Sequence, residues 1–513
     1  MKKTIQKLLA SLLAVALLCA MAVPAFAETQ DISGHSFSAY QIFKGKVKDS
    51  TLSNVEWGAG IDHEALLTKL TTDSSLSEYF GGITTASTAA QVAEKMSGWS
   101  ETDVKTTAFA KAVSECLAGN ATYTNANHTI HFGDAGYYLI KDTTVITPGK
   151  NNVANISLLK VTAAKSDVTV KSKVEKPTVT KQVEDNNDGA ATGDDNGFGS
   201  SADHAIGEVF RFKLTANVPA SSNNAYDFYK YYKVAFSDTM SEGLTFDEIE
   251  SVTIKSGSVT KTLTDSEYTR APHTDVNGFE LTISDVKALV TNLNSGAEIT
   301  VLYKAHLNEK AAVNNASSTT TNENKVSLQY SNNPNVEDSF DTTPYETVYV
   351  FTYQLNNTKY KNSVADENKL SGAGFRLYRD ADCKNEVQLY KEGNFYFPIK
   401  GTTGKTAAEM VSGEDGQFNV KGLDAGTYYL QETTTPDGFN TCGPTTIIIS
   451  ATHTGNHVTL SEDSNLSNNI INKQGATLPS TGGMGTTLFY VLGGGLMVAA
   501  VVLLVTKKRM ENK

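Results

Sequence analysis

The stretch GTYYLQET, residues 426–433, indicates the fold class of the C-terminal part of this chain. Tyrosine and threonine recur in it, and aromatic and β-branched residues are enriched in β-strands. Similar runs occur at YVFTYQL (349–355), GAGFRLYRD (372–380) and TTIIIS (445–450), and turn residues lie between them. Short strands with frequent turn signals predict an immunoglobulin-like β-sandwich.

The rest of the chain extends this pattern to several domains. The chain has 513 residues, which is too long for one ordinary domain. Residues 177–345 are also rich in strand-forming residues and turns, and they predict a further β-sandwich. We expect a signal peptide at 1–27, domains at 28–173, 174–345 and 346–474, and a terminal sorting segment at 475–513.

The first domain has a mixed pattern. HSFSAYQIFKGKV (35–47) and AGYYLIKDTT (135–144) are typical of strands, whereas STAAQVAEKM (87–96) and TTAFAKAVSECL (106–117) have helical spacing. The expected fold class is therefore mainly β, with tandem immunoglobulin-like sandwiches after a mixed α+β N-terminal domain.

The N-terminus has the three parts of an export signal in order. Lysines occur at three of the first seven positions, an apolar run covers 8–20, and Ala25, Phe26 and Ala27 fit a small-residue cleavage site. The mature chain would then begin at Glu28.

The C-terminus has an apolar run that predicts a membrane anchor. Residues 488–505 would span about 27 Å as a helix, close to the thickness of one hydrocarbon core. Lys507, Lys508 and Arg509 follow, and positive charge holds that end in the cytoplasm. The run by itself leaves a permanent single-span anchor open.

The pentapeptide before this run is Leu478, Pro479, Ser480, Thr481 and Gly482. With the apolar run and the basic residues after it, it resembles the LPxTG sorting signal of Gram-positive surface proteins. The resemblance implies that a sortase cysteine attacks the Thr481 carbonyl and releases Gly482 with the anchor. The acyl group then passes to an amine: a peptidoglycan peptide gives an anchored protein, and a lysine of another copy gives a polymer.

AGTYYLQETTTPDGF, residues 425–439, resembles the E-box of Cna protein B-type domains. The resemblance implies that Glu432 promotes an isopeptide bond between Lys359 and Asn472. Strand side chains alternate between faces, and each of the three shares a face with apolar neighbours, so all three should point inward. A buried lysine loses its proton more readily, and a buried glutamic acid keeps its proton and can polarise the asparagine carbonyl. The alternative is a buried ion pair with a hydrogen-bonded asparagine.

The middle domain repeats this arrangement with an aspartate. Lys181, Asp238 and Asn324 each alternate in phase with apolar residues. They fall in the places of the isopeptide-forming second domain of fimbrial shaft pilins, which this region resembles. Asn322 and Asn332 share the parity of Asn324 and remain alternatives, as does an aspartate that caps a turn.

The segment DVTVKSK, residues 167–173, resembles the pilin motif of shaft subunits, although Lys171 and Ser172 replace its usual Tyr-Pro. Lys173 falls in the place of the acceptor lysine. It is out of phase with the neighbouring valines and should be exposed, as an acceptor must be. Lys171 and Lys176 are the next candidates for the acceptor. The alternative without function is that Lys173 is an ordinary solvated lysine.

The composition excludes several classes of function. The net charge is −12, with 44 Lys+Arg against 56 Asp+Glu, so no basic surface indicates nucleic acid. No Ser/His/Asp or phosphate-binding signature points to an enzyme. No Cys/His cluster has metal-ligand spacing, and we expect neither metal nor cofactor. Cys383 and Cys442 could pair as a disulfide in an oxidising compartment, and Cys116 is expected as a buried free thiol.

Two hypotheses follow from these patterns. The first is a major pilin, secreted and covalently polymerised on the cell wall of a Gram-positive bacterium, with sortase, peptidoglycan and other pilin subunits as partners. The second is a wall-anchored adhesin or tip pilin that binds a host ligand. The DVTVKSK segment favours the first, since an adhesin needs no acceptor lysine.

Overall fold

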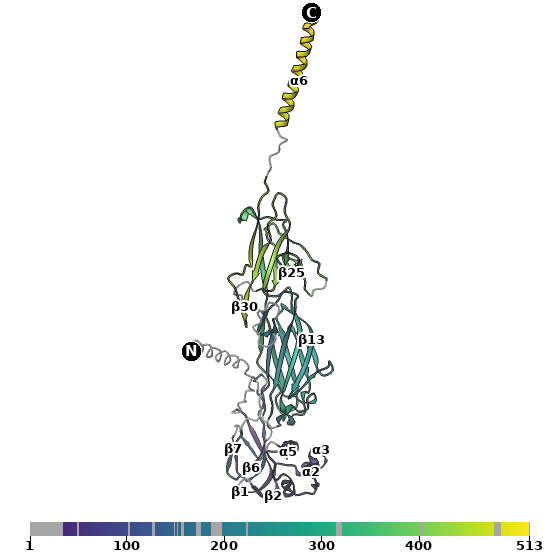
Figure 1. The fold of residues 1–513 in the computed structure, drawn as a ribbon. Coiled ribbons are helices and arrows are strands. Elements are labelled where there is room, and N and C mark those ends of the chain that lie inside the picture. Colours follow the sequence, from purple (N-terminus) through teal and green to yellow (C-terminus); the bar gives the residue numbers. More distant parts are fainter. Residues whose placement is uncertain are drawn as a thin grey trace, which may run out of the picture.

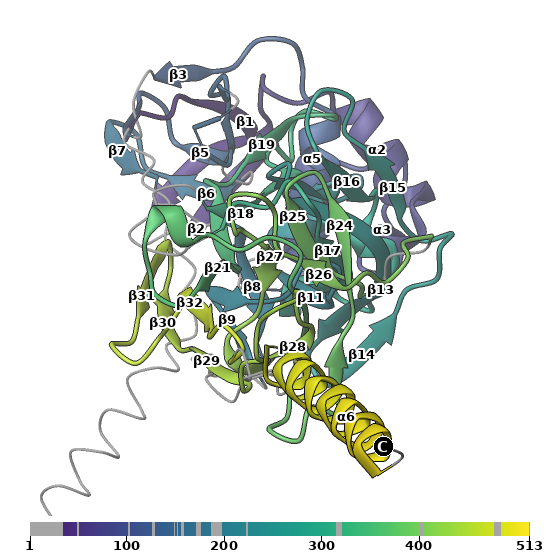
Figure 2. The ribbon, with the colours of Figure 1, turned by 90° about the horizontal axis from the view of Figure 1, so that it is seen from above.

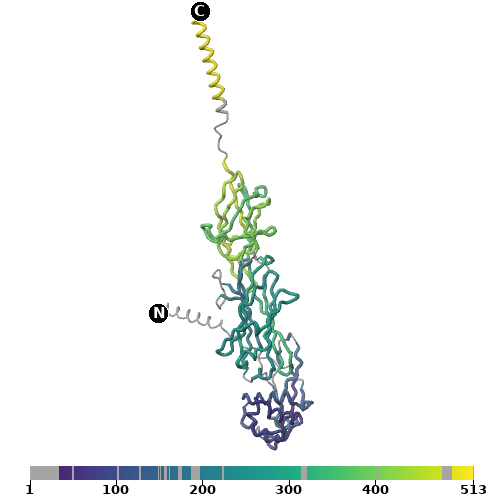
Figure 3. The backbone as a smooth tube through the Cα atoms, turned by 90° about the vertical axis from the view of Figure 1, so that its right-hand side faces the viewer, coloured from purple at the N-terminus to yellow at the C-terminus, as the bar shows by residue number. Residues whose placement is uncertain are grey.

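The computed structural model describes residues 34–48, 51–100, 103–125, 129–147, 149–150, 152–154, 158–170, 176–185, 197–221, 224–313, 321–400, 404–476 and 484–511. The predicted signal peptide, Lys173 and the pentapeptide 478–482 lie outside these residues. The domains follow one another along a rod, with the helix α6 (Met484–Glu511) at the end opposite the N-terminal domain (Figures 1 and 3). Viewed along the rod, they overlap behind one another (Figure 2).

The N-terminal domain packs helices against a small antiparallel sheet. The sheet has the order β2-β1-β5-β6, with β3 beside β1. Its strands are β1 (Phe37–Lys48), β2 (Thr51–Trp57), β3 (Tyr123–Asn125), β5 (Gly136–Asp142) and β6 (Leu158–Thr162). The helices are α2 (His63–Thr72), α3 (Ser74–Ser77), α4 (Ala89–Lys95) and α5 (Val104–Glu115). The predicted α+β character is confirmed.

A second, two-stranded sheet closes this domain. β4 (Thr129–Phe132) pairs antiparallel with β7 (Ser166–Thr169). Val168 is partly buried there and Val170 is fully buried, which is the inward face expected for the valines before Lys173.

The middle domain is a sandwich of two sheets. One has the order β10-β20-β18-β12-β16-β15, with β19 beside β18, and the other has the order β14-β13-β17-β11-β8-β9. The first sheet contains β10 (Ser201–Asp203), β12 (Val234–Met240), β15 (Thr269–Pro272), β16 (Gly278–Ile283), β18 (Asn322–Ser331), β19 (Phe340–Thr342) and β20 (Glu346–Phe351). The second contains β8 (Thr178–Glu184), β9 (Phe198–Gly199), β11 (Val209–Val218), β13 (Leu244–Ser256), β14 (Val259–Thr262) and β17 (Ala297–Leu307). Short 3₁₀ turns lie at η1 (Ala225–Phe228), η2 (Val286–Ala288) and η3 (Leu293–Ser295).

The last domain is a smaller sandwich. Its sheets have the orders β24-β25-β27-β21-β32 and β23-β22-β28-β29, and β26 pairs with β22. The first contains β21 (Tyr353–Lys361), β24 (Leu389–Glu392), β25 (Phe395–Pro398), β27 (Asn419–Leu423) and β32 (Ser467–Asn472). The second contains β22 (Gly374–Tyr378), β23 (Glu386–Val387), β26 (Met410–Val411), β28 (Gly426–Thr434) and β29 (Thr445–Ile449). The 3₁₀ turn η4 (Asp366–Asn368) follows β21, and a hairpin of β30 (Ala451–Thr454) and β31 (His457–Leu460) follows β29.

The domain boundary differs from the predicted one at 345/346. The strand β20, which we assigned to the last domain, pairs with β18 and β10 of the middle domain. The chain crosses to the last domain at Thr352, whose hydroxyl donates to the Leu423 carbonyl at 3.0 Å. The alternating pattern of residues 349–355 runs through both strands, so the sequence has no signal at the crossing.

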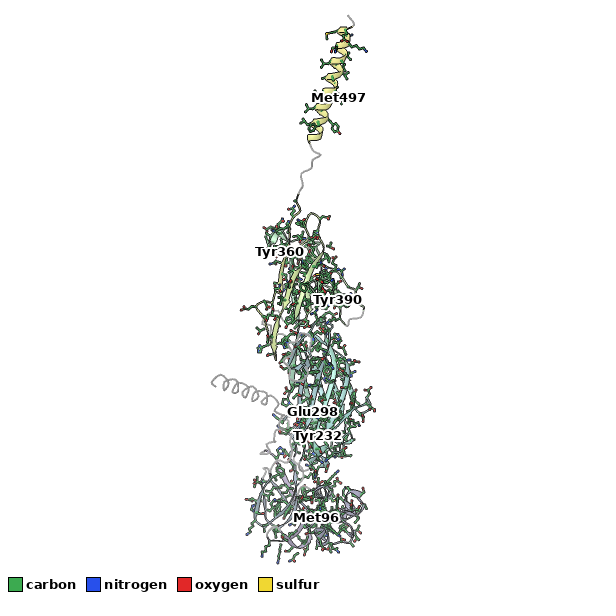
Figure 4. The ribbon with its side chains drawn as sticks, in the orientation of Figure 1. Met96, Tyr232, Glu298, Tyr360, Tyr390 and Met497 are labelled. Atoms are coloured by element: carbon green, nitrogen blue, oxygen red, sulfur yellow. The ribbon has the colours of Figure 1, made fainter. Side chains whose placement is uncertain are left out.

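Glycines allow the middle and last domains to approach closely. Gly207 has φ +77°, and a Cβ there would lie 2.0 Å from the Lys400 carbonyl oxygen. Ile206 N–H donates to the Gly422 carbonyl at 2.9 Å, so backbone groups of the two domains meet directly. At this joint the Tyr390 hydroxyl of the last domain also donates to Glu309 at 2.7 Å (Figure 4).

The helix α6 fits the predicted anchor. Its part from Leu488 to Glu511 is long and apolar enough to cross a membrane, and none of it is buried against the rest of the chain. The basic residues Lys508 and Arg509 lie in its last turn.

Candidate crosslinking sites

Three polar side chains meet in the core of the last domain. The Lys359 ammonium donates to Asn472 Oδ1 and lies 3.4 Å from Glu432 Oε1. Asn472 Nδ2 donates to the same Glu432 oxygen at 2.7 Å. Lys359 and Asn472 are 0% exposed and Glu432 is 5% exposed. The structure therefore brings together the three residues that the sequence singled out.

Strand geometry explains how they meet. β21 and β32 are the first and last strands of the domain and run parallel, with Lys359 opposite Ile470 and Lys361 opposite Asn472. Lys359 and Asn472 thus lie two positions out of direct register on neighbouring strands, with their side chains on the same inward face. Glu432 comes from β28 of the facing sheet, where residues 428, 430 and 432 alternate inward.

A cysteine completes this site. Cys442 N–H donates to Glu432 Oε2 at 2.8 Å, and its sulfur lies 3.5 Å from Lys359 Nζ. Burial raises the pKa of the Cys442 thiol. The ammonium also lies 5.1 Å from the centre of the Phe375 ring. The sequence assigned Cys442 to a disulfide and missed its position here.

The predicted Cys383–Cys442 disulfide is not formed, and both thiols are free. β22 pairs Phe375 with Glu432, which contacts Cys442, but Cys383 follows the other end of β22. That strand is about 13 Å long from its first to its last residue, beyond the usual Cα separation of a disulfide. Membership of one domain was not a sufficient criterion for pairing.

The middle domain assembles a second cluster between its two sheets. The Lys181 ammonium, on β8, donates to Asp238 on β12 and to the Tyr303 hydroxyl on β17 at 3.1 Å. Asn324 Nδ2, on β18, donates to the Tyr303 oxygen at 2.6 Å. Tyr303 in turn lies 3.1 Å from both Asp238 oxygens. The side chains of Lys181 and Asp238 are wholly buried.

Burial dominates the electrostatics of this cluster. Desolvation lowers the pKa of Lys181 to about 8, against the opposing charge of Asp238. Desolvation also raises the pKa of Asp238 above its usual range, and that of Tyr303 far above its own. The neutral lysine and the protonated acid are therefore both more accessible here than in water.

Tyr303 is the residue that the sequence analysis missed. It contacts all three expected members, and the described hydrogen bonds connect Lys181 and Asn324 only through its hydroxyl. Asn324 Oδ1 is buried and has no hydrogen-bond partner among the residues that the structure describes. The alternative asparagines bond elsewhere: Asn322 donates to the Ala312 and Val350 carbonyls, and Asn332 donates to Asn152.

Comparison with known proteins follows the same divisions of the chain. Residues 206–334 match the family described as "Gram-positive pilin backbone subunit 2, Cna-B-like domain", and residues 356–464 match the prealbumin-like fold domain family SpaA. Residues 470–512 match the LPXTG cell wall anchor motif. These segments of the chain are similar to the domains and the anchor of Gram-positive backbone pilins. The anchor match places the chain at the cell wall of a Gram-positive bacterium.

The relatives that this chain matches are distant in sequence. A trypsin-resistant surface T6 protein of Streptococcus pyogenes is 24% identical over 233 residues, which is 41% of this chain and 40% of that protein. The aligned part is thus less than half of that relative's length. The T6 backbone pilin structure from S. pyogenes is 17% identical, with a TM-score of 0.44 over 87% of this chain and 97% of that one. Full-length RrgB from Streptococcus pneumoniae is 16% identical, with a TM-score of 0.43 over 88% and 92%.

Proposed function

We propose that this chain is a backbone pilin, the shaft subunit of a covalent polymer that is joined head to tail by sortase and closed internally by two lysine–asparagine isopeptide bonds. The observation that carries the proposal is the buried contact of Lys359 with Asn472 beside Glu432. A buried ammonium and carboxylate are costly unless they are paired or consumed, and an amide bond removes the charge of the lysine.

The bond in the last domain forms in one balanced step. Neutral Lys359 Nζ attacks the Asn472 Cγ, the Nζ–Cγ bond forms, and the Cγ–Nδ2 bond breaks. Glu432 Oε1 lies 3.4 Å from Nζ and 2.7 Å from Nδ2, so it can take the proton from the lysine and deliver it to the leaving nitrogen as ammonia departs. This role differs from our expectation that Glu432 would polarise the carbonyl. The reaction occurs once per chain, so the protein is not an enzyme with turnover.

The bond in the middle domain needs a further movement. Lys181 and Asn324 both donate a hydrogen bond to the Tyr303 hydroxyl oxygen. This one oxygen therefore keeps the lysine nucleophile and the asparagine amide next to each other. When Nζ moves past this hydroxyl to the Asn324 Cγ, the Nζ–Cγ bond forms, the Cγ–Nδ2 bond breaks, and a proton from Nζ passes to Nδ2 so that ammonia leaves. Protonated Asp238 is then available to stabilise the amide, and the fold supplies a high effective concentration of the reactants.

The two bonds would protect the domains against pulling. In the last domain, tension enters at the start of β21 and leaves at the end of β32. A Lys359–Asn472 bond connects these strands directly. The pulling force then bypasses the chain between these two residues, which are 113 positions apart. In the middle domain, a Lys181–Asn324 bond would join the two sheets. Covalent bonds here replace a folding stability that is ordinarily only about 5–15 kcal/mol.

Polymerisation uses residues outside the described ranges. Sortase would cleave after Thr481, and the thioester carbonyl would pass to the Lys173 amine of the next subunit. The motif resemblance supports Lys173 as the acceptor, together with the sequence pattern, in which Lys173 is out of phase with Val170; Val170 itself is buried in the structure.

The test is electrophoresis of cell-wall extracts after boiling in SDS. Wild type should give a ladder of high-mass species, and Lys173→Arg should abolish it. Lys176→Arg is the matched control and should keep the ladder. A ladder that survives Lys173→Arg would move the acceptor elsewhere, and a single wall-anchored monomer in wild type would favour the adhesin hypothesis.

A further inference from the structure

A cluster of buried ionisable groups lies where the middle and last domains meet. Asp185 directly follows β8 and Asp203 ends β10, both in the middle domain. His453 lies in β30, whose hairpin reaches from the last domain to this joint (Figure 1). The three residues are only 1–2% exposed. Neither candidate crosslinking site includes any of them.

The donor atoms of the three residues converge. One donor atom from each lies within 4.8 Å of the others. His453 Nε2 is 3.0 Å from Asp185 Oδ2, and its other ring nitrogen is 2.9 Å from the Ser201 hydroxyl. Tyr353 donates to Asp203 Oδ2 at 2.7 Å. The side chains of His453 and Asp203 are therefore each oriented by a hydrogen bond from outside the cluster.

Asp185 is not satisfied by hydrogen bonds. Neither of its carboxylate oxygens accepts a hydrogen bond from any residue that the structure describes, although both are buried. His453 Nε2 lies close enough to Asp185 Oδ2 for an ion pair, but the contact does not have the geometry of a hydrogen bond. A buried carboxylate without donors is strongly unfavourable unless a cation neutralises it.

A third aspartate lies beside the cluster. Asp424 of the last domain is also buried and bonds the Asp203 side chain. Two ligand aspartates face one imidazole at this buried point, so the cluster holds more acidic than basic groups.

We propose that Asp185, Asp203 and His453 bind one divalent transition-metal ion, of the Zn²⁺ or Mn²⁺ type, which fastens the last domain to the middle domain. One imidazole and two carboxylates suit these ions, whereas Ca²⁺ prefers six to eight oxygen ligands. Ligand bonds of about 2.0–2.2 Å place the donors of one ion up to about 4.4 Å apart, so small side-chain rotations suffice.

The ion would complete the mechanical design of the subunit. The two proposed isopeptide bonds lie within domains, and the described joint between these domains has only non-covalent contacts. A metal with ligands from both sides would stiffen this joint. The sequence analysis expected no metal because it searched for local Cys/His spacing, and these ligands come from three distant positions.

The test is isothermal titration of the full chain, purified in detergent and stripped with a chelator, with Zn²⁺, Mn²⁺ and Ca²⁺ in turn. We expect one Zn²⁺ or Mn²⁺ per chain and much weaker Ca²⁺ binding. Asp185→Asn should weaken the binding at least about tenfold, since even outer-shell changes cost 10–100-fold. The matched control is His131→Gln, which removes a histidine 2.6 Å from Asp167 at an exposed site and should leave the binding unchanged.

X-ray absorption of the zinc-loaded wild type provides a readout that does not depend on a variant folding. It should show nitrogen and oxygen ligands and no sulfur. Sulfur ligation, an affinity unchanged in Asp185→Asn, a preference for Ca²⁺, or no binding to wild type would each overturn the proposal.

Discussion

Glu432→Gln separates the chemistry of the last-domain site from its packing. Glutamine has nearly the same shape and still offers an oxygen to Asn472 Nδ2, which is 2.7 Å from the present carboxylate. It cannot carry the proton from Lys359 to the leaving nitrogen. We therefore expect a folded last domain without the Lys359–Asn472 bond.

The size of the effect follows from the loop that the bond closes. Lys359 and Asn472 are 113 positions apart. The chain-entropy relation for a crosslink that closes such a loop gives about 5 kcal/mol of stabilisation at 25 °C. For a domain of this size, that loss lowers the midpoint of thermal unfolding by roughly 20 °C.

Scanning calorimetry and intact mass measure the two consequences together. In Glu432→Gln, one thermal transition should fall by this amount and the chain should retain the mass of one ammonia, about 17 Da. Glu409→Gln is the control, since this glutamate bonds the Thr433 and Thr434 hydroxyls near the surface, and it should behave as wild type. A Glu432→Gln chain that still loses the ammonia would refute the proton-transfer role.

The middle domain offers further predictions. Tyr303→Phe removes the hydroxyl that holds both reactants and should slow crosslinking of Lys181 at least about tenfold in a mass time course, whereas Tyr226→Phe, which loses a buried hydrogen bond elsewhere in the domain, should not. Asn324→Ala leaves Lys181 titratable, with a pKa lowered from 10.5 to about 8, so the folded chain binds fewer protons than the unfolded chain above pH 8. Its unfolding free energy should therefore rise between pH 8 and 10, by at most about 2.7 kcal/mol, and wild type should lack this rise because its Nζ is an amide. Parallel slopes in denaturant titrations of the two chains would contradict the assignment.

Strand alternation made much of the fold and of both sites predictable. Lys359, Glu432 and Asn472 each fall in phase with buried apolar neighbours, and the structure has all three inside. The same holds for Lys181 and Asp238. A period of two fixes the face of a side chain as soon as the strand is recognised.

Which strands face one another was not predictable in the same way. Tyr303 alternates inward on β17 like any core aromatic, and its contact with Lys181 depends on how the two sheets stack. The assignment of β20 failed for a related reason, since one alternating run crosses from one domain to the next. Cys442 lies outside the named strands, where alternation gives no information about its neighbours.

The intact mass of the wild-type mature chain is the most direct measurement of the central claim. Two isopeptide bonds release two ammonia molecules, so the account predicts a mass about 34 Da below that of the mature sequence. Tandem spectra should assign one bond to Lys181 and Asn324 and the other to Lys359 and Asn472. A mass equal to that of the uncrosslinked sequence would contradict the claim.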